Sequence, residues 1–569
     1  MNINLRNKKP PIYNRKYQIS NELADLDPII AKILSARGVT KEEHFCYRLK
    51  SLAPISSLEN INDAVDLLIK HKEHKIVVVG DFDVDGATSV ALLLRCLKDF
   101  GFNNLDYIVP NRFDDGYGLT IGVVNEAARL EPKLIITVDN GISSLKGVDE
   151  ARNLGIEVLV TDHHLPGDEL PKANVILNPN LKESTFVSPN LAGVGVAFYL
   201  LAGLGRVLES QGLKNAARIP LRYLDLVALG TVADVVKLDF NNRVLVYQGL
   251  QAIKKKSCVV GILALLEKSG KDYKKITSAD LGFSIGPKIN AAGRLDDIST
   301  GIECLITDDI NTAKKYTDNL LKTNEKRRNI EAKMHQEAFD YINQIDSKNM
   351  PSCLCVYNKN WHQGVVGLVA SRLKEYCNRP VIAFADDNDG ILKGSARSIH
   401  GVHIRDLLEA ISANHFGLIE KFGGHSMAAG LSLKMENFAE FKLYASKYLQ
   451  KLYPSADFSG AIYTDGEISP EKLNLEFAKM IQKFGPWGAG FEIPLFHGKF
   501  HLLDQRVVGE NHLKMQVKPI KGETQIDAIA FNQERIISRD PLELIYKLEV
   551  NEFRGKVTEQ LLVENIYSN

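Results

Sequence analysis

The stretch Ile76–Gly86, IVVVGDFDVDG, sets the organisation of the chain. Its apolar half, Ile76–Gly80, predicts a short buried strand, and the apolar residues after it predict a helix over residues 87–100. Three carboxylates stand at every second position between these elements: Asp81, Asp83 and Asp85. Carboxylates this close repel one another unless a cation neutralises them, and Mg²⁺ and Mn²⁺ prefer oxygen ligands. The stretch predicts either a metal site or a polar turn whose aspartates cap the helix.

The composition is that of an ordinary globular protein. The chain has 569 residues, of which 45% are hydrophobic and 25% charged. This length is too great for one hydrophobic core, so we expect roughly two to four domains. The 70 Lys and Arg residues equal the 70 Asp and Glu residues in number. A nucleic-acid-binding surface would therefore have to be local.

Cysteine usage and the apolar segments indicate the compartment. The seven cysteines are scattered singly, apart from Cys353 and Cys355, whose spacing suits neither a zinc site nor a disulfide framework. We expect them to be reduced core thiols. The N-terminal residues MNINLRNKKPP lack an apolar signal core, and no run of about eighteen apolar residues occurs. We therefore expect a cytoplasmic protein that does not enter a membrane.

Alternating strands and helices follow a helical N-terminal segment. Apolar residues at helical spacing occur in Asp27–Ala36 and Asn60–Lys72. From Ile76 onward, short apolar strands alternate with predicted helices such as Thr120–Leu130 and Ser143–Leu154, which is typical of a parallel α/β sheet. The predicted strands are Ile76–Gly80, Tyr107–Val109, Leu134–Val138, Glu157–Thr161 and Asn174–Leu177.

Polar side chains stand at the ends of these strands. The third strand is followed by Asp139, Asn140 and Gly141, and the fourth by Asp162, His163 and His164. Right-handed crossovers bring the carboxyl ends of parallel strands to one edge of the sheet, where open α/β sheets place their sites. Imidazole among carboxylates favours Mn²⁺ over Mg²⁺. The side chains that can meet at this edge are Asp83, Asp85, Asp139, His163 and His164.

The motifs DFDVDG, TVDNG and TDHH, in this order and spacing, resemble the DHH phosphoesterase superfamily. Within it, the chain resembles the RecJ family of single-strand-specific 5′→3′ exonucleases, from about residue 20 to the C-terminus. Phe82, Val84 and Lys288 depart mildly from the family pattern, and none of these changes removes a ligand. The further matching segments are NRFDDGYGL (Asn111–Leu119), LAGVGVAF (Leu191–Phe198), DLVALGTVADVV (Asp225–Val236), IGPKINAAGRL (Ile285–Leu295), WHQGVVGLVASRL (Trp361–Leu373), GSARS (Gly394–Ser398) and FGGHSMAAG (Phe422–Gly430).

The resemblance implies two metal ions, Mn²⁺ or Mg²⁺, bridged by one carboxylate. It makes Asp139 the bridge and Asp83 a ligand of the first ion, with Asp81 as a helper. His164 would contact phosphate or support the ligands. The ligands implied for the second ion are Asp85, His163 and Asp234.

Two aspartates of the same segment compete for the last ligand position. Asp225 lies nine residues before Asp234. We prefer Asp234 because it ends an apolar run, whereas Asp225 could point outward from a helix.

Cationic and aromatic residues would complete a phosphodiester-cleaving site. Arg294 and Lys288, in a predicted Gly- and Asn-rich turn (GPKINAAGR), are placed to stabilise the developing negative charge, although they could also be solvated loop charges. The resemblance makes Arg112 a phosphate anchor and Tyr117 a base-stacking residue. Tyr117 could equally be a packing residue.

The next region predicts a long helix and a second α/β domain. The helix runs from Asp309 to about Ile345 and contains the basic run Lys322–Asn329, which is either a solvated face or part of a DNA path. The following domain resembles the DHHA1 domain, with Gly-rich turns predicted at GSARS and FGGH. His362 would shape the turn before a helix at Val365–Lys374. The proposed grip on a 5′-terminal phosphate is made by Ser395 and Arg397, and the contacts near the cleavage point by Gly423, Gly424 and His425.

The last hundred residues predict a helical piece, Pro470–Phe484, and a small β-barrel. Short alternating strands there fit an OB-fold, which binds single strands through groove charge and base stacking. The stacking candidates are Phe500, Phe531 and Tyr546, about half of which alternation would place in the core. The predicted strands are Lys499–Val508, His512–Lys518, Thr524–Phe531, Leu544–Phe553 and Gln560–Tyr567.

Together these features predict an α/β protein with the following parts: an N-terminal segment packed on the DHH domain (1–70), the parallel-sheet DHH domain (71–308), a connecting helix (309–345), the DHHA1 domain (346–452), and a linker helix with an OB-fold (453–569). The resemblance implies a 5′→3′ exonuclease that releases 5′-mononucleotides in DNA repair and recombination. Implied partners are single-stranded DNA with a 5′ end, a single-strand-binding protein and a helicase. The alternatives are a hydrolase of short oligonucleotides, pyrophosphate or polyphosphate, and an inactive DNA-binding scaffold.

Overall fold

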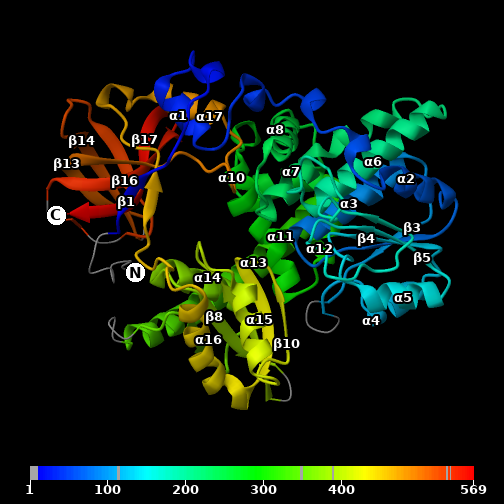
Figure 1. Ribbon diagram of the computed structural model, residues 1–569. Coiled ribbons are helices and arrows are strands. Elements are labelled where there is room, and N and C mark those ends of the chain that lie inside the picture. The colour runs from blue at the N-terminus through cyan, green and yellow to red at the C-terminus, as the bar shows by residue number, and fades with distance from the viewer. Residues whose placement is uncertain are drawn as a thin grey trace.

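A parallel five-stranded sheet forms the centre of the first lobe (Figure 1). The computed structural model describes residues 10–111, 116–345, 350–387, 390–509, 511–533, 536–537 and 540–568. The strand order is β3-β2-β4-β5-β6, and every neighbouring pair is parallel. The carboxyl ends of all five strands therefore lie at one edge, as predicted. The strands are β2 (Ile76–Val79), β3 (Leu105–Ile108), β4 (Leu134–Val138), β5 (Glu157–Thr161) and β6 (Val175–Leu177).

Helices cover both faces of this sheet because alternate strand residues point to opposite sides. Val77 and Val79 pack with the helices of one face, and Ile76 and Val78 with those of the other. The helices of the first face are α4 (Ile121–Ala128) and α5 (Leu145–Asn153). Those of the second face are α3 (Val84–Asp99), α6 (Gly193–Ser210) and α7 (Leu224–Ala233). Within the described chain, α6 is the one helix long and apolar enough to cross a bilayer, and 78% of it is buried inside the protein.

A helical layer completes the first lobe, and it corrects one prediction. The segment GPKINAAGR is not a turn but lies in α11, which begins at Gly286 and has Pro287 in its first turn, where a proline is tolerated. Gly293 is needed for packing rather than for turning, since a Cβ there would lie 1.9 Å from the Phe82 carbonyl oxygen. The elements of this layer are η5 (Ala216–Arg218), η6 (Pro220–Tyr223), α8 (Phe240–Lys254), α9 (Val260–Lys268), η7 (Tyr273–Lys275), α10 (Ser278–Asp280), the π-helix η8 (Leu281–Ile285), α11 (Gly286–Leu295) and α12 (Ser299–Ile306).

The predicted long helix is present as α13 (Ile310–Asn343), and the Asp309 side chain caps its first turn by accepting the Thr312 N–H. Its buried residues lie near the two ends, and the basic run Lys322–Asn329 lies between them. The helix thus joins the two lobes (Figure 1).

The second lobe contains a mixed sheet of order β10-β11-β9-β8-β7, in which only β7 and β8 are parallel. The predicted Gly-rich turns are wrong here. Gly394–Arg397 lies within a strand paired on both edges, and Phe422–Gly424 pairs with Gly430 and its neighbours. The elements are β7 (Leu354–Tyr357), α14 (Val366–Cys377), β8 (Val381–Asp386), β9 (Ile391–Arg397), α15 (Ile404–Asn414), β10 (Lys421–Gly424), β11 (Ala428–Lys434), η11 (Met435–Asn437) and α16 (Phe438–Leu452).

The C-terminal region is a closed five-stranded barrel of order β13-β14-β15-β17-β16, with β15 and β17 parallel. Phe500 and Tyr546 are buried in its core, so they are not available for base stacking, whereas Phe531 is 53% exposed. The predicted helix at 470–484 is divided into η12 (Pro470–Lys472) and α17 (Leu475–Lys483). The barrel strands are β13 (Phe496–Val508), β14 (His512–Pro519), β15 (Ile526–Ala530), β16 (Leu542–Phe553) and β17 (Lys556–Ser568).

The N-terminal segment reaches the C-terminal region as well as the first lobe. Its strand β1 (Ile12–Asn14) pairs in parallel with β12 (Ile462–Thr464). The buried Arg37 side chain binds Asp465 at 2.7 Å. The helices of the segment are η1 (Asn21–Leu23), α1 (Pro28–Ser35), η2 (Glu42–Phe45), η3 (Leu49–Ser51), η4 (Ile55–Ser57) and α2 (Ile61–Lys70).

Candidate metal centre

The three aspartates after β2 have different surroundings. Asp83 is the N-cap of α3, and its Oδ1 accepts the N–H groups of Asp85 at 2.8 Å and Gly86 at 3.2 Å. Helix α3 starts at Val84, three residues before the predicted start, because this cap fixes its first turn. Asp85 is therefore a helical residue and is completely buried. The capping alternative is thus correct for Asp83, and it does not exclude a metal site.

Backbone groups hold the Asp85 carboxylate in place. Its two oxygens accept the N–H groups of Gly193 at 2.6 Å and Val194 at 2.9 Å, at the positive N-terminus of α6. A Cβ at Gly230 would lie 2.9 Å from Asp85 Oδ1, so a glycine is required where α7 passes. Burial and the nearby Asp83 raise the pKa of Asp85 to about 7, against the effect of the two amide donors.

Asp139 lies directly beyond β4 in the left-handed region, with φ 61°. The side chain is buried, and its Oδ1 lies 3.0 Å from His163 Nε2. Gly193 packs against it so closely that a Cβ there would lie 2.6 Å from Asp139 Cβ. Burial and the repulsion of Asp85 and neighbouring carboxylates raise the pKa of Asp139 well above its ordinary value.

Asp162, which sequence reasoning did not select, organises the two histidines. Its buried carboxylate accepts the N–H groups of His163 and His164 and bonds His164 Nδ1 at 2.8 Å. Its other oxygen accepts the Ile142 N–H at 2.9 Å. Burial, followed by repulsion from His164, lowers the pKa of His163 to about 3, so its imidazole is neutral, as a metal ligand must be. The only sequence signal for Asp162 was its place in TDHH.

The structure separates the two rival aspartates of α7. Asp234 caps the C-terminal end of the helix, with Oδ2 3.5 Å from His163 Nε2. Asp225 is buried in the first turn and accepts the Val259 N–H at 2.8 Å. Asp234 joins the cluster of acidic and imidazole groups, whereas Asp225 binds the backbone just before α9 and belongs to none of the donor groups.

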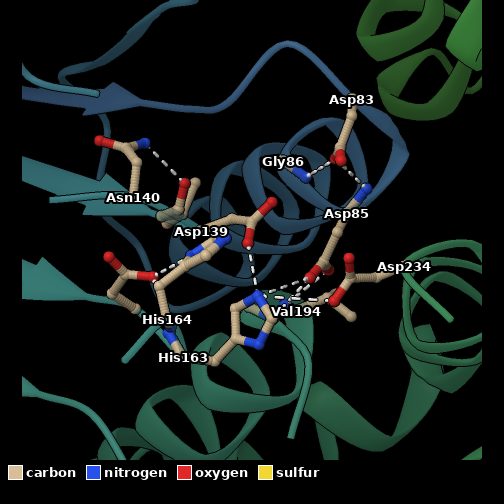
Figure 2. Close-up of polar contacts among 12 residues, drawn as sticks. Asp83, Asp85, Gly86, Asp139, Asn140, His163, His164, Val194 and Asp234 are labelled. Carbon is tan, nitrogen blue, oxygen red and sulfur yellow. Dashed lines mark hydrogen bonds and ion pairs between the residues drawn. The ribbon is translucent and has the colours of Figure 1, made fainter. Parts of the chain in front are cut away.

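These side chains form overlapping groups of donors, and Figure 2 shows all of their members except Asp81. Within each group the donor atoms lie within 4.8 Å of one another. Asp139 belongs to two groups and His163 to two. The groups among the described residues are Asp81, Asp83 and Asp139; Asp85, His163 and Asp234; and Asp139, His163 and His164.

The donor set fits divalent cations. Asp139 Oδ1 and His163 Nε2 are buried atoms without a hydrogen-bond partner, and they face each other. Burial and the charges of Asp85 and Asp83 also raise the pKa of Asp234 well above its ordinary value. A cation would satisfy both atoms and relieve this repulsion, and carboxylates with imidazole suit Mn²⁺ and Mg²⁺. The clustering predicted at the edge of the sheet is therefore present.

Of the cationic and aromatic candidates, Tyr117 contacts this cluster, and Lys288 and Arg294 bind backbone carbonyls. Lys288 Nζ donates to the Ser284 carbonyl at 2.5 Å, and Arg294 Nη1 donates to the Gly364 carbonyl of the second lobe at 3.2 Å. Tyr117 donates to the Asp139 carbonyl at 3.2 Å, and the residue is 46% exposed. Arg112 lies outside the described residues.

The second lobe brings its own polar residues toward the cluster. The His425 ring stacks on His164, with ring centroids 5.7 Å apart. Arg397 bonds Ser395 Oγ at 3.0 Å, and a Cβ at Gly367 would lie 2.9 Å from both side chains. Since Gly367 is in the first turn of α14, these two side chains lie at a helix N-terminus.

The glycines and His362 of this lobe have distinct structural roles. Gly424 has φ 138°, and a Cβ there would lie 2.5 Å from the Ala428 carbonyl oxygen. Gly423 faces open space. His362 accepts the Gly364 N–H at 3.1 Å and so shapes the turn before α14, as predicted. Gly423 and Gly424 thus place backbone without side chains directly before His425.

Three regions of the chain are similar to known protein families. Three family models match: the DHH family N-terminal domain at residues 75–231, the DHHA1 domain at 350–451 and the RecJ OB domain at 464–565. The single-stranded-DNA-specific exonuclease RecJ of Escherichia coli strain K12 is 46% identical over 556 residues, 96% of each chain. That of Dickeya dadantii is 47% identical over 97% of this chain and 98% of the relative.

Solved structures show the same fold. RecJ of Thermus thermophilus in complex with Mn²⁺ superposes with a TM-score of 0.81 at 28% identity, covering 98% of this chain and 80% of that one. Its Mg²⁺ complex gives a TM-score of 0.75 at 26% identity, covering 98% and 79%. Sequence, fold and the donor cluster lead to one conclusion: the chain belongs to the RecJ family of single-stranded-DNA-specific exonucleases and is a metal-dependent nuclease.

Proposed function

We propose that the protein degrades single-stranded DNA from its 5′ end, releasing 5′-mononucleotides by two-metal hydrolysis, and that it acts in DNA repair and recombination in the cytoplasm. The observation that supports this most strongly is the overlap of the three donor groups, because Asp139 links the group of Asp81 and Asp83 to His163, and His163 also belongs to the group of Asp85 and Asp234. Asp139 would bridge two ions, with Asp81 and Asp83 on the first. The second ion would take Asp85, His163 and Asp234.

The chain's residues would divide the work as follows. When bound, two divalent ions neutralise the attacking and leaving oxygens and lower the pKa of water. His163 stays neutral and presents Nε2 to the centre. Burial lowers the pKa of His164, but its hydrogen bond to Asp162 and the negative charges of Asp162, Asp81 and Asp83 together outweigh this, so the pKa is raised overall. His164 therefore carries more positive charge near neutral pH than a free imidazole, and it would contact a phosphate oxygen.

The direction of digestion would be set in the second lobe. Ser395 and Arg397 stand at the N-terminus of α14, where free N–H groups and the helix dipole favour an anion. A guanidinium adds charge-assisted hydrogen bonds to phosphate. A terminal 5′-phosphate held there would place the next phosphodiester toward His425 and the metal centre, because His425 stacks on His164.

The barrel and further proteins would act on the incoming strand. Phe531 is exposed beside His512, with ring centroids 4.9 Å apart, and would stack on a base. We include a single-strand-binding protein and a helicase as proposed partners, since these supply ordered or newly unwound single strands.

The decisive experiment uses oligonucleotides labelled at either end. With Mn²⁺, a 5′-labelled single strand should yield labelled mononucleotide at once, and a 3′-labelled strand should shorten progressively. Blunt duplex should be resistant. Early release of mononucleotide from the 3′ label, or digestion of duplex alone, would contradict the proposal. Asp85→Ala and His163→Ala should lose hydrolysis while single-strand binding in EDTA is largely retained.

A further inference from the structure

The π-helix η8 holds a large aromatic side chain in solvent. Phe283 is 87% exposed, although Leu281 and Ile285 of the same turn are completely buried. Leaving a Phe in water forgoes the gain of burying it. π-helical turns are rare and occur frequently at functional sites. Exposure alone does not mark a site, since Phe416 is fully exposed too, but Phe283 is exposed on a π-helical turn.

This turn lies against the end of α7 that carries Asp234. A Cβ at Gly282 would lie 3.2 Å from Val232 Cγ1, and one at Gly286 would lie 3.4 Å from Ala233 Cβ. Both contacts are with the last residues before Asp234, whose carboxylate lies 3.5 Å from His163 Nε2. Phe283 thus projects from the segment that adjoins the metal centre.

A second exposed apolar residue follows Asp234. Val235 is 69% exposed and has φ 61°. Glycine is usual at this position after a helix, and a β-branched residue there is strained. Such strain persists mainly at functional sites. We call Phe283 and Val235 the apolar lip.

Cationic side chains lie near Phe283. Lys288 Nζ is bonded to the Ser284 carbonyl, next to Phe283. Arg328 and Lys271 are close enough to contribute to the lowered pKa of Lys288, after the larger effect of burial, and Lys271 also pairs with Asp280 at 2.7 Å. An aromatic ring among cationic side chains is the combination that binds single-stranded nucleic acid, because every base has a π-face.

We propose that Phe283 stacks on a base of the substrate strand beside the metal centre and that Val235 supports the same base. This rests on the proposed function, since it assumes a single strand at that centre. Phe283 is then a substrate-binding residue that fixes the register of the strand relative to the cleaved bond.

The test is a set of oligonucleotides that carry one abasic site at successive positions from the 5′ end. Their binding is measured in EDTA with wild type and Phe283→Ala. Loss of the stack should weaken binding of the intact strand about 5- to 100-fold. At one abasic position the variant should cause no additional loss, because the stacked base is already absent. Phe283→Trp should restore affinity, and Phe283→Leu should not.

Phe416→Ala is the matched control, because Phe416 is a fully exposed phenylalanine of the second lobe. It should leave binding unchanged. The inference would be overturned if Phe283→Ala lost the same amount of binding affinity at every abasic position, or lost none. Hydrolysis by the wild type is measured in parallel. If the wild type cleaves single strands 5′→3′ but Phe283→Ala shows no dependence on the abasic position, only the stacking of Phe283 is rejected. If the wild type neither binds nor cleaves single strands, both proposals are rejected.

Val235→Gly gives an independent readout. Glycine accepts a positive φ without strain, so the variant should unfold at a higher temperature than wild type. It should at the same time bind the intact strand more weakly. An unchanged dissociation constant would remove Val235 from the proposed lip.

Discussion

The two α/β lobes present opposite chemistry to each other. The sheet of the first lobe ends in buried carboxylates whose charges repel, and Asp139 Oδ1 has no hydrogen-bond partner there. The second lobe offers Arg397 and Ser395, bonded to each other at a helix N-terminus. The first arrangement suits cations and the second suits anions. The equal totals of acidic and basic residues conceal this separation, which only the positions of the charges reveal.

The largest effect is expected from a change in the carboxylates of the first lobe. Asp139→Asn removes the charge of the proposed bridge, while Asn tolerates the left-handed backbone at this position. Loss of several kcal/mol of electrostatic stabilisation should lower kcat by about 10³-fold or more. Mn²⁺ binding, followed by calorimetry, should fall from two ions to fewer. Asp106→Asn, which changes a carboxylate ion-paired to Lys75 in the same sheet, should have neither effect.

Asp162→Asn should have a smaller effect of the same kind. The residue holds His163 and His164 without belonging to any of the donor groups. Supporting residues of metal sites usually contribute 10- to 100-fold, so we expect about that loss in activity or Mn²⁺ affinity. Activity should recover partly as the Mn²⁺ concentration is raised. An inactive variant with unchanged Mn²⁺ affinity would contradict this role.

The cationic side is tested by Arg397→Ala. Loss of a charge-assisted hydrogen bond should raise KM for a 5′-phosphorylated strand about 10-fold, with a smaller change for a 5′-hydroxyl strand. Mn²⁺ binding should not change. Lys393→Ala is the control on the same strand, since Lys393 pairs with Asp387 instead. Equal effects on both strand types would show that Arg397 does not recognise the terminal phosphate.

The smallest expected effect concerns stability. Without metal, the raised pKa of Asp85 near 7 means that the folded state holds a proton that the unfolded state releases near pH 4. Its contribution to stability is therefore lost as pH rises between about 4 and 7. In EDTA, the difference between the thermal unfolding midpoints of Asp85→Asn and wild type should shift in favour of the variant as pH increases from 5 to 8. Saturating Mn²⁺ should reverse the trend, because it binds the carboxylate.

Several features were predictable because they depend on local periodicity. The strands β4 and β5 have the predicted bounds, and the long helix and the barrel are present. The clustering of Asp85, Asp139 and His163 followed from the parallel order of the strands. The wrongly predicted turns contain glycines that serve other purposes. In α11 a glycine allows close packing, and in β9 and β10 the Gly-rich segments pair as strands.

By itself, the sequence determined which residues end each strand and therefore which chemistry can gather at one edge of the sheet, since side-chain periodicity and crossover handedness are local rules. Tertiary structure decided the choice between Asp225 and Asp234, the role of Asp162, and the burial of Phe500 and Tyr546. These outcomes depend on which helix or strand packs against each residue. Such contacts join segments far apart along the chain, so no local pattern could fix them.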